Sequence, residues 1–129
     1  MKVGIIGLGY VGVQLAVALG KRLVTVGFDP DETKINSYKA GIDQTGEVLQ
    51  SQFESARKTI YTTNINDLRD CQIYIVAVPT PVDHLNQPDF EPLLKASTTV
   101  GQVMRPGATV IYESTVYPGA TEEICVPVL

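Results

Sequence analysis

The sequence predicts a doubly wound α/β fold, in which a parallel five-stranded sheet is covered by helices on both faces. Three observations predict it. Short runs rich in β-branched residues alternate with segments of helical periodicity along the chain. The run at 72–78 (QIYIVAV) is almost wholly apolar, as a central parallel strand buried on both faces should be. A glycine-rich turn joins the first strand to the first helix, which is typical of this fold.

Each element follows from its local pattern. Strands are predicted at 2–6, 23–28, 60–63, 72–78 and 108–113. Helices are predicted at 10–20, 31–39, 89–104 with Asp89 as N-cap, and 118–129, with a further helical piece at 52–58 and a capped turn at 64–69. Right-handed crossovers then give the strand order 3-2-1-4-5. The last helix should lead to a sixth strand, so we expect 1–129 to be an N-terminal piece of a longer protein whose sixth strand is truncated.

The first turn has the spacing G-x-G-x-x-G, formed by Gly7, Gly9 and Gly12. Gly7 allows the tight turn off the strand, Gly9 leaves room for a pyrophosphate beside the backbone, and Gly12 lets the helix pack closely on the sheet. The start of the helix supplies free N–H groups and the positive end of its dipole to the phosphates. In this strand–turn–helix context, the motif predicts a Rossmann-type dinucleotide-binding site.

An acidic residue ends the second predicted strand. Asp29 follows Gly12 by 17 residues, close to the offset of about 20 at which such folds place the acid that binds ribose. Its carboxylate can accept hydrogen bonds from the adenosine ribose hydroxyls. A 2′-phosphate would meet this negative charge, and the next residues, Pro30, Asp31 and Glu32, include no arginine to neutralise it. The sequence therefore favours NAD over NADP.

Composition narrows the function classes. The chain has 129 residues, 44% of them apolar and 19% charged, which suits one globular domain. A net charge of −4 without a basic run argues against nucleic-acid binding, and no apolar stretch is long enough to span a membrane. Cys71 and Cys125 lack metal-ligand spacing, and His84 has no companion ligands, so we expect no metal, two reduced structural cysteines and a cytoplasmic protein.

Five stretches together resemble the N-terminal NAD-binding domain of the UDP-glucose/GDP-mannose dehydrogenase family: KVGIIGLGYVGVQLAVALG, VGFDPDETKI, VAVPTPVD, PDFEPLLKAS and YESTVYPGATEE. The resemblance implies an enzyme that oxidises the C6 alcohol of a nucleotide sugar to a carboxylate with NAD, in the biosynthesis of surface polysaccharides. The segment GIDQTGEV at 41–48 is more similar to the branch that oxidises UDP-N-acetylhexosamines than to UDP-glucose dehydrogenases proper.

The resemblance also implies roles for individual positions. Lys34 matches a residue beside the adenosine ribose, Thr80 lines the cofactor cleft, and Thr115 helps to hold a water or the developing oxyanion beside the nicotinamide, which makes it the catalytic candidate. The full set of implied cofactor contacts is Gly7, Gly9, Tyr10, Val11, Gly12, Asp29, Lys34, Thr80, Ser114 and Thr115.

The family's catalytic cysteine lies in a second nucleotide-binding domain, and its oxyanion lysine and asparagine lie in a central region. Neither Cys71 nor Cys125 has such a context. We therefore expect half of an enzyme, inactive alone, which meets its UDP-sugar substrate through domains beyond 1–129 and forms a homo-oligomer when full-length. Two alternatives are a free-standing NAD-sensing regulatory domain, like those attached to ion transporters, and a different NAD-dependent oxidoreductase. A pure sensor would not need VPTPVD or ESTVYPG.

Overall fold

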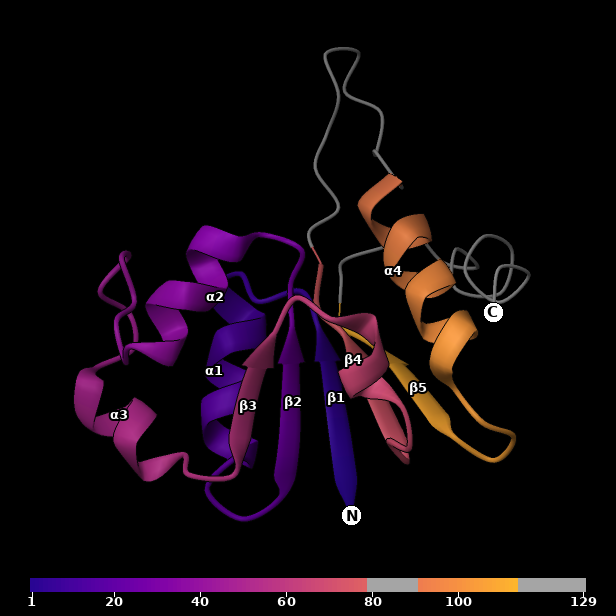
Figure 1. Ribbon diagram of the computed structural model, residues 1–129, viewed down its shortest axis with the longest axis horizontal. Helices are drawn as coiled ribbons and strands as arrows, with labels where there is room; N and C mark the ends of the chain where they lie inside the picture. The colour runs from indigo at the N-terminus through magenta and orange to yellow at the C-terminus, as the bar shows by residue number, and fades with distance from the viewer. Residues whose placement is uncertain (79–90, 114–129) are drawn as a thin grey trace.

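The computed structural model describes residues 1–78 and 91–113 (Figure 1). Their centre is a parallel sheet with the order β3-β2-β1-β4-β5, which confirms the predicted order. The strands are β1 (Lys2–Ile6), β2 (Val24–Phe28), β3 (Thr59–Thr62), β4 (Ile73–Val76) and β5 (Thr109–Tyr112). Because all strands run in one direction, their carboxyl ends form a single edge, on which ligands of doubly wound folds bind.

Helices cover both faces of the sheet, as the doubly wound prediction requires. The helices are α1 (Tyr10–Leu19), α2 (Glu32–Lys39), α3 (Gln50–Ser55) and α4 (Glu91–Val103), and a 3-10 turn, η1, spans Ile65–Leu68. One hydrophobic cluster joins α1, α2 and α3 to the sheet. A second cluster on the opposite face joins η1 and α4 to it.

The near-continuous apolar character of the central strands follows from this double cover. Side chains alternate between the two faces of a strand. In β4, Ile75 packs in the cluster beneath α1, whereas Tyr74 and Val76 pack in the cluster beneath η1 and α4. In β1, Ile5 and Ile6 divide in the same way. Both faces are dry, so apolar residues are favoured at every position.

The helical piece predicted at 52–58 lies earlier, at Gln50–Ser55. Its start is set by a side chain that the periodicity did not reveal, because Gln52 Oε1 accepts the Leu49 N–H at 2.8 Å. The loop before it is closed by Asp43, whose carboxylate accepts the N–H groups of Thr45 and Val48. Burial acts to raise the pKa of Asp43, but the hydrogen bond from the Thr45 hydroxyl, followed by those from backbone N–H groups, outweighs it and holds that pKa below its ordinary value.

Other boundaries differ from the predictions by one or two residues. For example, β3 begins at Thr59, where it pairs with Thr25 of β2, and β4 ends at Val76, the partner of Ile6. The described part of α4, Glu91–Val103, lies within the helix predicted at 89–104, and Pro92 lies in its first turn, where a missing N–H costs little. The predicted N-cap Asp89 and the predicted helix at 118–129 lie outside the described residues.

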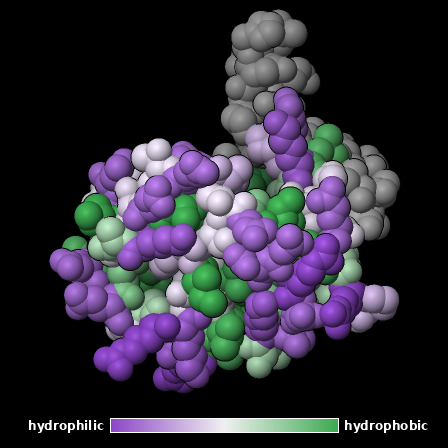
Figure 2. Space-filling view, viewed as in Figure 1, coloured by the Kyte–Doolittle hydropathy of each residue, from purple (hydrophilic) through white to green (hydrophobic). Residues whose placement is uncertain are grey.

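The face in Figure 2 is largely hydrophilic, with hydrophobic residues scattered between polar ones. Tyr10 and Val11 are exposed, by 59% and 47%, although they stand in the first turn of α1 beside the glycine motif. Within 1–78 and 91–113, no helix is long and apolar enough to cross a membrane.

Candidate functional site

Two of the three motif glycines are required by the chain itself. Gly7 has φ +97°, a conformation that other residues adopt at a cost, and a Cβ there would lie 2.7 Å from Val78 Cγ1. A Cβ on Gly12 would lie 1.8 Å from the carbonyl oxygen of Gly7. The turn and the close packing of α1 on the sheet therefore explain both residues without a ligand.

Gly9 is different. Its backbone, with φ −72° and ψ −159°, is extended and open to any residue. A Cβ on it would meet nothing within 4 Å among the described residues. Internal packing gives no reason for a glycine here, whereas a ligand that must approach the backbone does. This is the property that a pyrophosphate site needs.

The start of α1 is left open. Gly9 is its N-cap and has no side chain to accept a hydrogen bond, and the first turn of the helix has no acidic residue. At this end the Val13 N–H donates to the Gly9 carbonyl at 3.0 Å. The N–H groups of the first turn have no partner within a helix, so they and the dipole can serve an anion.

Asp29 is fixed at the end of β2 by backbone groups. It is 7% exposed. Its Oδ2 accepts the Leu8 N–H at 2.9 Å, and its Oδ1 accepts the Asp31 N–H at 3.0 Å. Each carboxylate oxygen can accept a further hydrogen bond. The acid is therefore pre-oriented for a hydroxyl-rich group such as ribose.

A cation stands beside this acid. Lys34 Nζ lies 3.4 Å from Asp29 Oδ2, with the lysine side chain 35% exposed. The first turn of α2 brings this residue, five positions along the chain, back to the carboxylate, so the residues directly after Asp29 do not give the whole charge of the site. The cleft therefore presents a carboxylate–ammonium pair at the end of β2.

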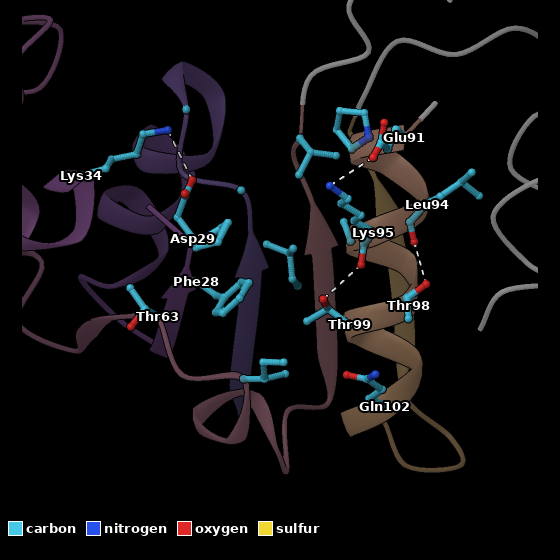
Figure 3. Close-up of a pocket in the computed structure, with 18 residues that line it drawn as sticks. Phe28, Asp29, Lys34, Thr63, Glu91, Leu94, Lys95, Thr98, Thr99 and Gln102 are labelled. Atoms are coloured by element: carbon cyan, nitrogen blue, oxygen red, sulfur yellow. Dashed lines mark hydrogen bonds and ion pairs between the residues drawn. The ribbon is translucent and has the colours of Figure 1, made fainter. Parts of the chain in front are cut away.

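These groups line a cleft of about 1150 Å³ (Figure 3). One wall carries Gly7, Gly9, Asp29 and Lys34. The opposite wall is α4, whose polar side chains face Asp29 and Lys34 across the gap in Figure 3. The cleft is also lined by the apolar side chains of Phe28, Ile65 and Val78 and by Thr63. A cleft with an acid, a cation and an open glycine turn on one side can hold an extended nucleotide.

Sequence reasoning placed a helix at α4 but did not assign it to the site. The residues of α4 that line the cleft are Glu91, Lys95, Thr98, Thr99 and Gln102, together with Pro92, Leu94 and Ala96. The polar ones are three or four positions apart, so helical spacing alone could have identified this face. The ion pair between Glu91 and Lys95 on this face, at 3.2 Å, is highly exposed and contributes little to stability.

The structure brings some of the predicted site residues together. Gly7, Gly9, Asp29 and Lys34 line the cleft. Tyr10, Val11 and Gly12 form the next turn, at the start of α1, without lining the cleft. Thr80, Ser114 and Thr115 lie outside the described residues, as do His84 and Cys125.

Cys71 is a buried free thiol just before β4, at the amino edge of the sheet and away from the cleft. Burial raises the pKa of this thiol, which disfavours the nucleophilic thiolate. The part of the chain that the structure describes has no group of three His, Cys, Asp or Glu residues able to hold a metal.

The parallel sheet, the open turn at Gly9 and the buried acid at Asp29 define a Rossmann-type dinucleotide-binding domain. The chain belongs to the UDP-glucose/GDP-mannose dehydrogenase family, whose NAD-binding domain matches residues 1–129. Its cofactor is therefore NAD.

Similar proteins support this family membership. The UDP-N-acetyl-D-glucosamine 6-dehydrogenase of Pseudomonas aeruginosa is 52% identical over 129 residues, which are 100% of this chain and 31% of that protein. Protein CapL of Staphylococcus aureus is 50% identical over 127 residues, or 98% of this chain and 30% of CapL. The chain thus spans about 30% of the length of these relatives.

Solved structures share the fold. The UDP-D-ManNAc dehydrogenase of Pyrococcus horikoshii superposes with a TM-score of 0.89 at 31% identity, over 95% of this chain and 30% of that one. The GDP-mannose dehydrogenase of Pseudomonas aeruginosa, in a ternary complex, gives 0.91 at 26% identity, over 99% and 31% of the two chains. Both confirm the predicted fold class and family.

Proposed function

We propose that residues 1–129 form the NAD-binding domain of a longer, cytoplasmic, NAD-dependent UDP-sugar 6-dehydrogenase, which oxidises the C6 alcohol of a UDP-N-acetylhexosamine to the uronate for surface polysaccharide biosynthesis. The open space at Gly9 carries the cofactor half of this proposal, since no described residue lies within 4 Å of a Cβ there and a pyrophosphate would fit beside the backbone. The substrate half is supported by the 52% and 49% identity to two UDP-N-acetyl-D-glucosamine 6-dehydrogenases. We expect a homo-oligomer that contacts its sugar mainly through other domains.

Each part of the cleft has a task in this proposal. The first turn of α1 binds the pyrophosphate through N–H groups, and Gly9 admits it. Asp29 and Lys34 hold the adenosine ribose. NAD, when bound, accepts the hydride that leaves the C6 carbon. By resemblance to the family, we expect Thr80, Ser114 and Thr115 to contact the cofactor, and Thr115 to help hold a water or the developing oxyanion beside the nicotinamide.

The test is a panel of UDP-sugars titrated into the full-length protein while NADH formation is followed. We expect a UDP-N-acetylhexosamine to be the best substrate, with two NAD reduced per sugar. The 129-residue chain alone should bind NAD and reduce none. NAD binding by the full-length protein without turnover of any UDP-sugar would contradict the enzyme and favour a regulatory NAD-binding domain.

Thr115 offers a sharper test of the chemistry. In the full-length enzyme, Thr115→Ala should lower kcat on the order of a hundredfold, as the loss of one oxyanion donor does elsewhere. NAD affinity should change little. A variant with normal kcat and a lower melting temperature would assign Thr115 a structural role only.

A further inference from the structure

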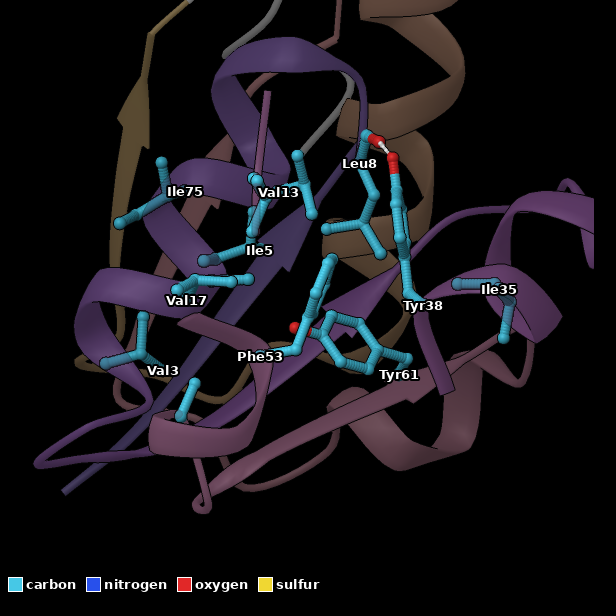
Figure 4. Packing of buried hydrophobic residues seen from close by; sticks show 13 residues of the cluster. Val3, Ile5, Leu8, Val13, Val17, Ile35, Tyr38, Phe53, Tyr61 and Ile75 are labelled. Atoms are coloured by element: carbon cyan, nitrogen blue, oxygen red, sulfur yellow. Dashed lines mark hydrogen bonds between the residues drawn. The ribbon is translucent and has the colours of Figure 1, made fainter. Parts of the chain in front are cut away.

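Leu8, the residue between Gly7 and Gly9, is held by hydrogen bonds at both its N–H and its carbonyl group. It is fully buried. Its N–H donates to Asp29 Oδ2 at 2.9 Å, and its carbonyl oxygen accepts the Tyr38 hydroxyl at 2.8 Å (Figure 4). The first partner belongs to the ribose-binding acid. The second reaches the turn from α2, 30 residues further along the chain, and belongs to no dinucleotide motif.

We propose that Tyr38 is a positioning residue for the cofactor site: its buried hydroxyl holds the Leu8 carbonyl and so fixes the glycine turn in the shape that receives a dinucleotide pyrophosphate. This inference rests on the proposed function of the cleft. Tyr38 does not touch the cofactor in this proposal; it acts through the backbone of the turn.

The peptide that joins Leu8 to Gly9 connects the two groups. Its carbonyl accepts from Tyr38, and its N–H belongs to Gly9, the residue nearest to the incoming phosphates in this motif. The buried Leu8 side chain anchors one end of this peptide in the core. At the other end, a Cβ on Gly9 would have no neighbour within 4 Å among the described residues, so side-chain packing does not restrain the Gly9 end. The Tyr38 hydroxyl supplies that restraint, together with the Val13 N–H bond to the Gly9 carbonyl.

The hydroxyl is well suited to hold one orientation. Tyr38 is 7% exposed, and its ring packs against Phe53 and Tyr61 at centroid distances of 5.8 and 5.7 Å. Burial, followed by the nearby charge of Asp43 and other acids, raises the pKa of Tyr38 to about 12. The group is therefore a neutral donor at physiological pH, and the buried Leu8 carbonyl would be left without this partner if it were removed.

The same aromatic cluster provides a matched control. Tyr61 is 9% exposed and packs against Phe53 and Tyr38. In the described part of the chain its buried hydroxyl has no hydrogen-bond partner. Tyr38→Phe and Tyr61→Phe thus remove the same atom from neighbouring rings, and only the first removes a bond to the glycine turn.

The experiment measures NAD affinity, melting temperature and amide hydrogen exchange for both variants in the full-length protein. Tyr38→Phe should weaken NAD binding roughly three- to tenfold, the range expected for one hydrogen bond lost to a buried carbonyl. Exchange across residues 7–12 should become faster in this variant. Tyr61→Phe should leave the affinity and this exchange at wild-type values.

Two outcomes would overturn the inference. The first is a Tyr38→Phe variant with wild-type NAD affinity, even if it melts at a lower temperature, because Tyr38 would then serve packing alone. The second is an equal loss of affinity in both variants, which would assign the effect to the cluster and not to the hydrogen bond. Wild-type protein that fails to bind NAD would instead refute the proposed function, so the two failures are distinguishable.

Discussion

α1 and α2 begin at the same edge of the sheet, but their first turns are built in opposite ways. The start of α2 is satisfied by its own side chains, because Asp31 accepts the Lys34 N–H at 3.2 Å and Glu32 places a negative charge in the first turn. The start of α1 has neither a side-chain cap nor an acid. Capping side chains and acids complement the donors and the dipole of a helix start.

This difference shows how one fold separates stability from binding. In a capped helix, the N–H groups of the first turn already have side-chain acceptors and are not available to an anion. An uncapped one keeps its N–H groups and its dipole for a ligand, at some expense in its own stability. Asp29, at the end of β2, accepts the Leu8 N–H of the glycine turn and also contacts Asp31 and Lys34 at the start of α2, so it connects the two helix starts.

The largest expected effect comes from closing the open turn. Gly9→Val should weaken NAD binding by roughly a hundredfold or more, which is about 2.8 kcal/mol, because the side chain would occupy the pyrophosphate position. The melting temperature should change little, since none of the described residues lies within 4 Å of a Cβ on Gly9. Titration with NAD and a thermal melt check both statements.

Gly12→Ala is the control for that variant. Its Cβ would lie 1.8 Å from the Gly7 oxygen, so the protein should lose stability. If Gly9→Val bound NAD normally, the comparison between the two helix starts would lose its functional meaning.

The next effect concerns the acid beside the turn. Asp29→Ala should weaken NAD binding roughly ten- to a hundredfold, because hydrogen bonds to a charged group are worth about 1.5–3 kcal/mol. Binding of NADP should weaken far less, or improve, as Lys34 loses its partner and can meet a 2′-phosphate. The two nucleotides are compared in one titration series. Equal losses for both would mean that Asp29 only holds the backbone at Leu8 and Asp31.

A smaller effect should arise at the capped helix. Asp31→Ala removes the side-chain cap of α2 and should cost about 0.5–2 kcal/mol of unfolding free energy. NAD affinity should stay within about twofold, or roughly 0.4 kcal/mol, because the Asp31 N–H that supports Asp29 remains. Denaturant unfolding and NAD titration separate the two quantities. A large loss of NAD affinity would show that both helix starts serve the ligand.

The smallest expected effect is a pH dependence of stability that arises from Tyr38, in the last turn of α2. The pKa of Tyr38 rises from 10.0 to about 12 on folding, mainly through burial. Folding thus keeps the proton, so this contribution to stability is present below pH 10.0 and is lost as the pH rises to about 12. Thermal melts across this pH range should show a smaller fall in melting temperature for Tyr38→Phe than for the wild type. Tyr61 and Tyr74, whose pKa values are also raised, should contribute to the loss of stability that remains in this variant. An identical fall in the variant would exclude a contribution from Tyr38.

Local pattern was sufficient for much of the fold and for part of the site. Strand runs, helix periodicity and turn residues lie within short windows, and the chirality of crossovers converts their order into the arrangement 3-2-1-4-5. The glycine spacing and the acid after the second strand are equally local, so the sequence alone was enough to assign Gly7, Gly9 and Asp29 to one cleft. The boundaries of α3 could not be predicted in this way, because the side chain of Gln52 decides where that helix begins.

By itself the sequence determined a doubly wound sheet and an NAD-binding domain, and it predicted an acid at the end of the second strand, since these depend on residue types at fixed spacing. Only the tertiary structure decided which motif glycines the chain's own packing requires, because Gly7, Gly9 and Gly12 look alike in sequence and differ in their neighbours. It also decided that Lys34 pairs with Asp29 and that Tyr38 holds Leu8. Such contacts depend on distances of a few ångströms between separate elements, which packing sets and residue spacing does not encode.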